Sequence, residues 1–510
     1  MKTTRKNIRA DYLAATSDLQ AFYHYPIQQP DFAQIISDKS KELTDRESLH
    51  KALSQQYQGI STSDATRKNI DALRDKQTFT LTTGHQLVLF GGPLYTIYKV
   101  LTIIKLAEEL RDRFSDYQFV PVFWIHTEDH DFEEINHYYT SFTDKHTYQG
   151  AFSGKVGGHI LDESIISLIP AHFPQALKEA YQPGRSMSEA YFRFMNDLFK
   201  DYGLVILDAD HPALKQAFRH VLKDELSQQS GFEEVNETSS RLQAAGYPLQ
   251  ISPREINLFY TDTNLRNRIV QKNGHYEVLD SALRFAPSEL LQIAEQQPER
   301  FSPNVCLRPL YQEIILPNLA YTGGWAELAY WMQLRSLFEH HGVNFPLLLP
   351  RMSATVFPQK LQERWQALGF TKQDIHQPLH ALNKKYIPKL WQSDKFDELA
   401  QQLTHSYQTL ASYIGEISGT LVKSVKGQEV GAEKFLQNLE KKIHRVIRHQ
   451  YASPFKEIEQ IKFQLQPDPL VQERIWSLAA LPQIDPYEFV RLAWKKCQPL
   501  EIKHQYLVVD

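Results

Sequence analysis

The sequence predicts an α/β protein built on a doubly wound parallel sheet, followed by an antiparallel pair of long helices. Two observations favour the sheet. From Phe79 onward, short β-type runs alternate with helical runs, as they do in chains that form parallel sheets. Two of the β-type runs, VFWI and LVIL, are apolar throughout, which is typical of strands buried on both faces. The helix pair is indicated by apolar residues that recur every seven positions beyond residue 385.

Length and composition set the broad class. The chain has 510 residues, and because domains typically hold about 100–200 residues, we expect two or three folded units. Its formal net charge is -4 with both signs interspersed, which disfavours nucleic acid and favours a small molecule or protein as partner. Cys306 and Cys497 are far apart, so we expect no disulfide framework and a reducing cytoplasm. A polar amino terminus and the lack of a long apolar run predict that the protein is neither secreted nor membrane-spanning.

The elements follow in order. Residues 1–75 are polar and mixed in charge, and we expect a helical lead-in there. A core over residues 76–384 begins with strand FTLTT and helix PLYTIYKVLTIIKLAEELRDRF, then continues with strands VFWIH, where Pro121 marks the start, and GLVILDAD. Longer mixed segments at about 145–200 and 212–300 are predicted to be insertions into this core. The apolar stretches around LPNLAYTGGW and FPLLLPRMSATVF then return to the sheet.

A helical domain is predicted over residues 385–475. Two glycines in VKGQEVGAEK predict the turn between its two long helices. The hairpin either packs on a core of its own or forms an arm that can associate, and residues 476–510 return to the core. The apolar stripe of the first helix comprises Phe396, Leu403, Leu410 and Ile417, and that of the second comprises Phe435, Leu439, Ile443 and Val446.

The first stretch that could form a binding site is TLTTGHQLVLFGGPLYTIYK. Gly84, Gly91 and Gly92 permit backbone conformations or close approaches that a Cβ would oppose. Pro93 suits the first turn of the helix that follows. A strand, a glycine-rich loop and a helix start together direct unpaired N–H groups to one point, which favours an anion site to which Lys99 could add charge. The alternative is a tight turn without a ligand.

The second stretch, VFWIHTEDHDFEEINH, is dense in titratable groups just beyond a buried strand, where ligands bind in open α/β sheets. Three interpretations stay open. The first is a metal site, in which His126 and His130 share a helix face and ligate the ion together with Asp129 or Glu133. The second is substrate binding and proton transfer, and the third is a solvated acidic loop. The candidate side chains are His126, Glu128, Asp129, His130, Asp131, Glu133, Glu134 and His137.

The third stretch is RPLYQEIILPNLAYTGGWAELAYW. Arg308 could clamp a carboxylate or phosphate, and the glycine pair before a helical run is a second candidate anion cradle. Polar residues in this apolar context either satisfy one another structurally or belong to a site; they are Gln312, Glu313, Asn318 and Glu327. In PRMSAT, Arg351 and Ser353 could reach the same sheet edge.

Four strings, in this order, resemble the BshC family, the cysteine ligases of bacillithiol biosynthesis: TGHQLVLFGGPLYTIYK, PVFWIHTEDHDFEEINH, SPNVCLRPLYQEIILPNLAYTGGWAELAYW and PRMSAT. The resemblance implies a Rossmann-like core with connecting insertions and a carboxyl-terminal coiled-coil domain through which the chain forms a homodimer. It also implies the activity, which joins the carboxyl of L-cysteine to the amine of glucosaminyl-malate in the last step of the pathway. Activating a free carboxylate in water requires energy, for which the candidate sources are ATP with Mg²⁺, another activated donor or a partner protein. His85 stands where this family commonly has Gln.

The resemblance also implies roles for residues. The strings TGHQ and RMSAT are similar in order and placement to the two nucleotide motifs of class I aminoacyl-tRNA synthetases, although RMSAT lacks the second lysine. The expected catalytic residues are His126, Asp129, His130 and Asp131. The expected nucleotide or anion ligands are Thr83, Gly84, His85, Gln86, Gly91, Gly92, Lys99, Arg351 and Ser353. The expected substrate ligands are Glu128, Arg308, Gln312, Glu313, Asn318, Tyr321, Gly323, Gly324 and Glu327.

Two other functions compete with the ligase. One is a metal-dependent hydrolase that uses the His/Asp/Glu cluster, although the sequence does not say whether a metal is bound. The other is a non-enzymatic binding protein whose coiled coil is the working part.

Overall fold

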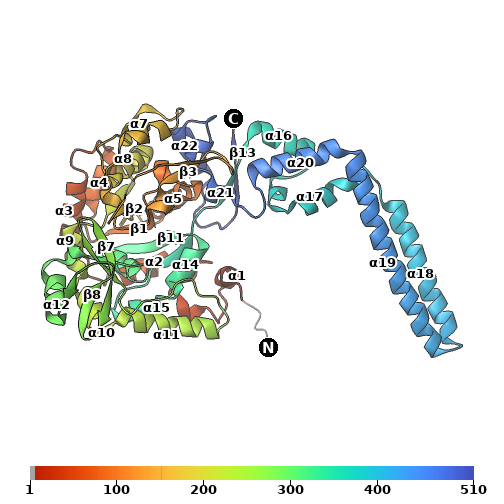
Figure 1. Cartoon of the computed structure of the whole chain (residues 1–510), viewed down its shortest axis with the longest axis horizontal. Helices are drawn as coiled ribbons and strands as arrows, with labels where there is room; N and C mark the ends of the chain where they lie inside the picture. Colours follow the sequence, from red (N-terminus) through yellow and green to blue (C-terminus); the bar gives the residue numbers. More distant parts are fainter. Residues whose placement is uncertain (1–5, 151) are drawn as a thin grey trace. The chain divides into compact units, whose positions relative to one another are not determined.

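The computed structural model describes residues 6–150 and 152–510, which form two compact units (Figure 1). The first comprises the chain up to Thr355 together with Glu473–Leu507, and the second comprises Val356–Gln472 with Val508–Asp510. The carboxyl-terminal segment Glu473–Leu507 thus belongs to the first unit.

A five-stranded parallel sheet forms the centre of the first unit. Its order is β12-β11-β1-β2-β5, so the chain builds outward from β1 on one side and then crosses to the other. This confirms the predicted doubly wound sheet, and it places the point where the strand order reverses between β1 and β11. The strands are β1 (Thr78–His85), β2 (Gln118–Ile125), β5 (Val205–Asp208), β11 (Asn318–Gly323) and β12 (Leu347–Pro350).

The position predicted for Pro121 is wrong. This residue lies in the middle of β2, opposite Leu81 of β1, rather than at the strand's start. The neighbouring strand β5 pairs with β2 only from Val122 onward. Pro121 therefore lies before the two-sided part of β2 begins, where a missing N–H group disturbs the ladder least.

Helices pack on the sheet from the lead-in and from the core. The long helix α5 (Leu94–Arg113) packs along β1, β2 and β11, and its apolar face is fully buried. The lead-in is helical as predicted, with α1 (Ile8–Leu13), α2 (Phe32–Lys39), α3 (Arg46–Gln56) and α4 (Asp64–Ala72). After β11 come α14 (Trp325–Met332) and α15 (Arg335–His340), and α22 (Pro486–Lys496) packs on α5.

The segments between the sheet strands carry structure of their own. Residues after β2 form α6 (Phe132–Ile135), a hairpin of β3 (His137–Tyr139) and β4 (Lys145–Thr147), α7 (Gln175–Ala180) and α8 (Met187–Phe199). Residues after β5 form a small antiparallel sheet of order β10-β6-β7-β8-β9. Its strands are β6 (Leu258–Asp262), β7 (Leu265–Lys272), β8 (His275–Val278), β9 (Arg284–Phe285) and β10 (Phe301–Pro303), and the helices are α9 (Pro212–Lys215), α10 (Arg219–Gln228), α11 (Ser230–Ala244), α12 (Pro287–Gln296) and α13 (Arg308–Ile315).

The second unit is helical, and it begins earlier than the boundary at residues 384 and 385 that we predicted. Helices α16 (Gln359–Ala367) and α17 (Leu379–Tyr386) pack on α20 (Ala452–Leu465). Because α20 buries Ile458, Ile461 and Leu465, these helices share a core that belongs to this unit. The chain passes between the units near β13 (Ala354–Pro358), α21 (Gln472–Ile475) and β14 (Gln505–Val509).

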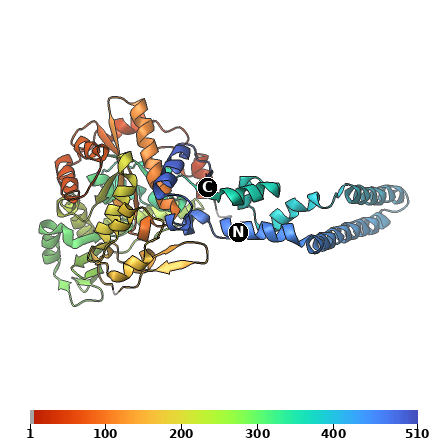
Figure 2. The ribbon, with the colours of Figure 1, turned by 90° about the horizontal axis from the view of Figure 1, so that it is seen from above.

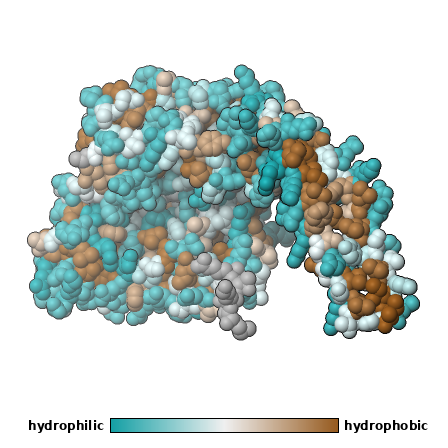
Figure 3. All heavy atoms as spheres, turned by 45° about the vertical axis from the view of Figure 1, so that its right-hand side comes forward, coloured by the Kyte–Doolittle hydropathy of each residue, from teal (hydrophilic) through white to brown (hydrophobic). Residues whose placement is uncertain are grey.

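The predicted hairpin consists of α18 (Asp394–Gly415) and α19 (Gly419–Gln450), which run side by side in Figures 1 and 2. The predicted turn is wrong, because Gly427 and Gly431 lie inside α19 and the chain turns at residues 416–418. A helix tolerates an interior glycine at a cost of about 1 kcal/mol. The pair leaves apolar side chains exposed (Figure 3), namely Leu399, Leu403, Leu410, Tyr413, Ile417, Leu421, Val430, Phe435 and Val446.

Every helix within residues 6–150 and 152–510 is either too short or too polar to cross a lipid bilayer.

Candidate active site

A cavity of about 540 Å³ opens at the carboxyl ends of β1, β2 and β11, where the strand order reverses. We call it the switch-point cavity. Ligands bind at this position in open α/β sheets. The residues predicted from the sequence that line it are Gly84, His85, Gln86, Lys99, His126, Glu128, Asp129, His130, Arg308, Tyr321 and Glu327.

His126 approaches the end of β1 because Gly84 has no side chain. A Cβ at Gly84 would lie 3.0 Å from His126 Nε2 and 3.1 Å from the Trp124 carbonyl oxygen. The His126 Nε2 atom is buried without a hydrogen-bond partner. Burial and the positive charge of Arg308 lower the pKa of His126 to about 3. This histidine is therefore a neutral imidazole near pH 7, able to accept or donate one hydrogen bond to a ligand.

His85 resembles His126 in its environment. Its Nε2 atom is also buried without a partner, and burial together with nearby cationic groups, Lys99 first, holds its pKa well below the ordinary range. The next residue, Gln86, donates hydrogen bonds to Asp129 at 2.8 Å and to Glu134 at 2.6 Å. The end of β1 thus presents the His85 imidazole, whose Nε2 atom has no hydrogen-bond partner, and the Gln86 amide, which orients the Asp129 carboxylate.

Asp129 is held as a carboxylate. Burial alone would raise its pKa, but hydrogen bonds from His130 and Gln86 and the charge of Arg266 hold the pKa well below its usual range. Arg266 hydrogen-bonds the ring of His130 and lies 3.7 Å from the Asp129 carboxylate. It comes from β7 of the small antiparallel sheet, and sequence reasoning missed it because nothing in LRNRIVQK indicates which side chain faces a ligand.

Lys99 and Glu327 neutralise each other in the wall of the switch-point cavity. The ammonium lies 2.6 Å from the Glu327 carboxylate and donates to the Gly84 carbonyl oxygen at 3.0 Å. Tyr321 also donates to Glu327, at 3.2 Å. A Cβ at Gly323 would lie 2.8 Å from a Glu327 oxygen, so this glycine gives Glu327 room rather than cradling an anion. The wall is therefore rigid and electrostatically balanced.

Arg308 is the cavity cation with a neutral partner. Its Nη1 donates to Gln312 Oε1 at 3.0 Å, whereas its Nη2 is buried without a hydrogen-bond partner. The guanidinium centre lies 5.8 Å from the Trp124 ring and 5.7 Å from the Tyr321 ring. Aromatic packing fixes its plane, and the free Nη2 can donate to a carboxylate or phosphate oxygen.

Three predicted substrate ligands lie behind Arg308 rather than in the cavity. Glu313 Oε1 accepts hydrogen bonds from Gln312 at 2.8 Å and from Asn318 at 2.7 Å. Burial raises the pKa of Glu313 to about 7. Because the Gln312 amide nitrogen points to Glu313, its oxygen points to Arg308. These residues therefore position Arg308.

The predicted phosphate cradle before α5 does not assemble. Gly91 and Gly92 adopt φ of +82° and +69°, and a Cβ at Gly92 would lie 2.2 Å from a Val88 methyl carbon. They turn and pack the chain. The first N–H of α5, at Leu94, donates to the Trp476 carbonyl oxygen at 2.7 Å. The chain's own carbonyl thus occupies the helix start, and neither glycine lines the switch-point cavity.

Other predicted residues also have internal partners. Arg351 pairs with Glu473 at 2.7 Å, and the Ser353 hydroxyl donates to the same carboxylate at 3.0 Å. Asp131 accepts a hydrogen bond from the Glu134 N–H as the cap of α6. Thr83 donates to the Thr322 carbonyl oxygen, and Gly324 caps α14 by its backbone. The structure places these five residues around the site, not in its lining.

The described residues do not form the helix face proposed for metal binding. His126 and His130 lie in a loop, since α6 begins only at Phe132. In the part of the chain that the structure describes, this loop does not bring three histidine, cysteine or carboxylate ligand atoms within 4.8 Å of one another. In this loop the Asp129 N–H donates to the His126 carbonyl oxygen and the Phe132 N–H donates to the His130 carbonyl oxygen, so two tight turns replace the helical spacing.

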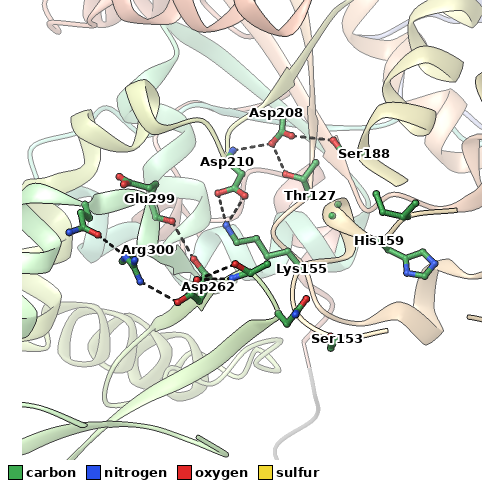
Figure 4. Close-up of a pocket in the computed structure, with 17 residues that line it drawn as sticks. Thr127, Ser153, Lys155, His159, Ser188, Asp208, Asp210, Asp262, Glu299 and Arg300 are labelled. Carbon is green, nitrogen blue, oxygen red and sulfur yellow. Dashed lines mark hydrogen bonds and ion pairs between the residues drawn. The ribbon is translucent and has the colours of Figure 1, made fainter. Parts of the chain in front are cut away.

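A second, more polar cavity of about 700 Å³ lies beside β5 (Figure 4). Thr127 lines it, whereas its neighbours His126 and Glu128 line the switch-point cavity. Asp208 and Asp210 line the second cavity, and Asp210 pairs with Lys155 at 2.7 Å (Figure 4). Asp208 ends β5 and Asp210 lies two residues further on. Two acidic residues at a strand's carboxyl end were a usable signal in GLVILDAD, which we predicted only as a strand.

Comparison with known proteins identifies the family. The description "Bacillithiol biosynthesis BshC, N-terminal Rossmann-like domain" matches residues 1–352, and "Bacillithiol biosynthesis BshC, C-terminal coiled-coil domain" matches residues 354–509. Proteins named "Putative cysteine ligase BshC" are similar over most of both chains. That of Flavobacterium psychrophilum is 37% identical and covers 91% of this chain and 90% of its own, and that of Flavobacterium johnsoniae is 36% identical with 98% and 96% covered. The chain therefore belongs to the BshC family of bacillithiol biosynthesis.

Proposed function

We propose that this chain is a cysteine ligase that joins the carboxyl group of L-cysteine to the amine of glucosaminyl-malate, the last step of bacillithiol biosynthesis. The proposal rests on the family and on one observation. Three buried polar nitrogens around the switch-point cavity lack hydrogen-bond partners: Arg308 Nη2, His126 Nε2 and His85 Nε2. Leaving such atoms unpaired costs about 1–3 kcal/mol each, and a ligand with carboxylate and hydroxyl oxygens would satisfy them.

The substrate groups can be assigned by charge. Arg308 would hold a carboxylate of the malate part, since its guanidinium has one open donor face. Asp129 stays ionised and would hold the ammonium group of cysteine. Amide formation removes one proton from the attacking amine as the C–N bond forms and the leaving group departs from the activated acyl carbon. The neutral His126 would accept a hydrogen bond from the attacking amine at Nε2 and orient it. The released proton passes to solvent, because an imidazole whose pKa is about 3 does not hold a proton near neutral pH.

Activation of the cysteine carboxyl needs an energy source. We propose ATP with Mg²⁺ as the donor to be tested, because free carboxylates do not form amides in water unaided. The residues expected to hold phosphates do not fit a nucleotide as a group, since the start of α5 is closed by Trp476 and Arg351 is paired with Glu473.

The reaction can be tested directly. Purified protein would be incubated with L-cysteine and glucosaminyl-malate, with and without ATP and Mg²⁺, and the products identified by mass spectrometry. The thiol product together with AMP or ADP supports the ligase and identifies the bond broken. Hydrolysis of glucosaminyl-malate without any amide product would contradict it.

Arg308 provides the test of the site. We expect Arg308→Gln to lower kcat/KM for glucosaminyl-malate by about 10-fold to 150-fold, the worth of one charged hydrogen bond of about 1.5–3 kcal/mol, with a smaller change for cysteine. Arg219→Gln is the matched control, because Arg219 is an exposed arginine paired with Glu295. Equal loss for both substrates, or no loss, would contradict the assignment.

We also propose that the chain is a cytoplasmic homodimer that associates through α18 and α19. Five large apolar side chains on these helices, Leu399, Leu410, Tyr413, Phe435 and Val446, are 45–65% exposed. Large apolar side chains left exposed along a pair of long helices are typical of association sites. Both cysteines are buried free thiols, which is compatible with a reducing compartment.

A further inference from the structure

A cluster of histidine and carboxylate groups lies outside both cavities, where α10, α11 and α15 pack together (Figure 1). Asp224 belongs to α10, His340 ends α15 and His341 follows it. The Nε2 atom of His340 lies 3.3 Å from Asp224 Oδ2, and the Nε2 atom of His341 lies 3.7 Å from the same oxygen. One ligand atom from each of the three residues lies within 4.8 Å of the others.

His341 carries a second, independent observation. Its side chain is 6% exposed, and its buried Nε2 atom has no hydrogen-bond partner. The nitrogen faces the Asp224 carboxylate at a distance too long for a hydrogen bond. An ion between the two groups would satisfy both, because imidazole nitrogen and carboxylate oxygen are each about 2.0–2.2 Å from a bound Zn²⁺.

The neighbours of the cluster hold its side chains in the orientation that metal binding needs. The Nδ1 atom of His340 lies 3.4 Å from Glu234 Oε1, so a proton on Nδ1 faces a carboxylate and Nε2 is left free. Metal-binding histidines commonly direct their other ring nitrogen to a carboxylate in this way. The Ser230 hydroxyl hydrogen-bonds Asp224 Oδ2, and the His220 ring packs against that of His341.

We propose that Asp224, His340 and His341 bind a divalent transition metal of the zinc class. Two imidazoles and one carboxylate suit Zn²⁺ or Co²⁺ and do not suit Mg²⁺ or Ca²⁺, which prefer oxygen ligands. Water completes the fourth position. The ion ties the end of α15 to α10, and its binding is independent of the ligase activity proposed above.

The test uses the full-length protein after removal of metal with a chelator. Calorimetric titration with Zn²⁺ should show one equivalent bound per chain, Co²⁺ should give the visible spectrum of a tetrahedral site, and Zn²⁺ should raise the Tm. We expect His340→Gln and His341→Gln each to weaken binding by at least 100-fold, and Glu234→Gln to weaken it by about 10-fold to 100-fold.

His50→Gln is the matched control, since the His50 ring pairs with a single carboxylate, Asp71, at 3.1 Å. His340 is 37% exposed, so its variant should fold, and circular dichroism checks this. Absence of one-equivalent binding would overturn the proposal. So would Zn²⁺ or Co²⁺ affinity that is unchanged in both His340→Gln and His341→Gln, because the ions would then be bound elsewhere.

Discussion

The substitution Gly84→Ala tests how closely the end of β1 and His126 must approach. The new methyl group would lie 3.0 Å from His126 Nε2 and 3.1 Å from the Trp124 carbonyl oxygen. Ordinary contact begins at 3.4 Å, so one neighbour must move by roughly 0.4 Å. Trp124 is held in β2 between two strands, and we therefore expect the imidazole to move.

The expected cost has two parts. Overpacking a buried position costs about 1–3 kcal/mol of stability, and a displacement of a few tenths of an ångström in a catalytic group should lower kcat by about 10-fold, because misplacement by 1 Å can cost about 100-fold.

Product formation followed by mass spectrometry gives the rate, and thermal unfolding gives the stability. Gly427→Ala is the control, because its Cβ would meet nothing within 4 Å and it should stabilise α19 by about 1 kcal/mol. A Gly84→Ala protein with unchanged kcat and Tm would refute the reasoning.

Two further predictions concern pH and assembly. Burial raises the pKa of Glu313 from 4.5 to about 7, so the unfolded chain releases this proton first and stability is lost as pH rises from about 4.5 to 7. The loss is about 3 kcal/mol of the free energy of unfolding. Glu313→Gln should abolish this loss when urea unfolding is measured at pH 5 and at pH 8. The same difference between the two pH values in both proteins would contradict the prediction. Changing Leu403 and Leu410 together to Glu should give a folded monomer by light scattering, and an unchanged dimer mass would place the interface elsewhere.

The sheet was predictable because its signals are local. VFWI and LVIL are apolar throughout, and a strand buried on both faces needs that property wherever it lies in the chain. The boundary of the second unit was not predictable. Helices α16 and α17 carry no heptad pattern, and they belong to that unit because they pack on α20, which follows some distance along the chain.

The candidate site was also predictable only in part. Residues at the carboxyl ends of β1 and β2, such as His85 and His126, could be placed together because neighbouring parallel strands end at one edge. The local sequence did not show which predicted residues already have partners within the chain. Arg351 meets Glu473, and Leu94 at the start of α5 meets the Trp476 carbonyl. These partners are distant in sequence, and each already pairs with a group that we predicted to bind a ligand.

Charge balance then decides what the switch-point cavity can hold. Among the described residues that line it, Lys99 is neutralised by Glu327, and Arg266 lies beside Asp129. Arg308 has no carboxylate partner among them, and its Nη1 donates to the neutral Gln312 amide oxygen, so an arriving anion gains most there. The Gln312 amide is oriented by Glu313. Glu313→Gln should therefore stabilise the protein near pH 8 and yet raise KM for glucosaminyl-malate, because a second amide lets Gln312 turn its donor toward Arg308.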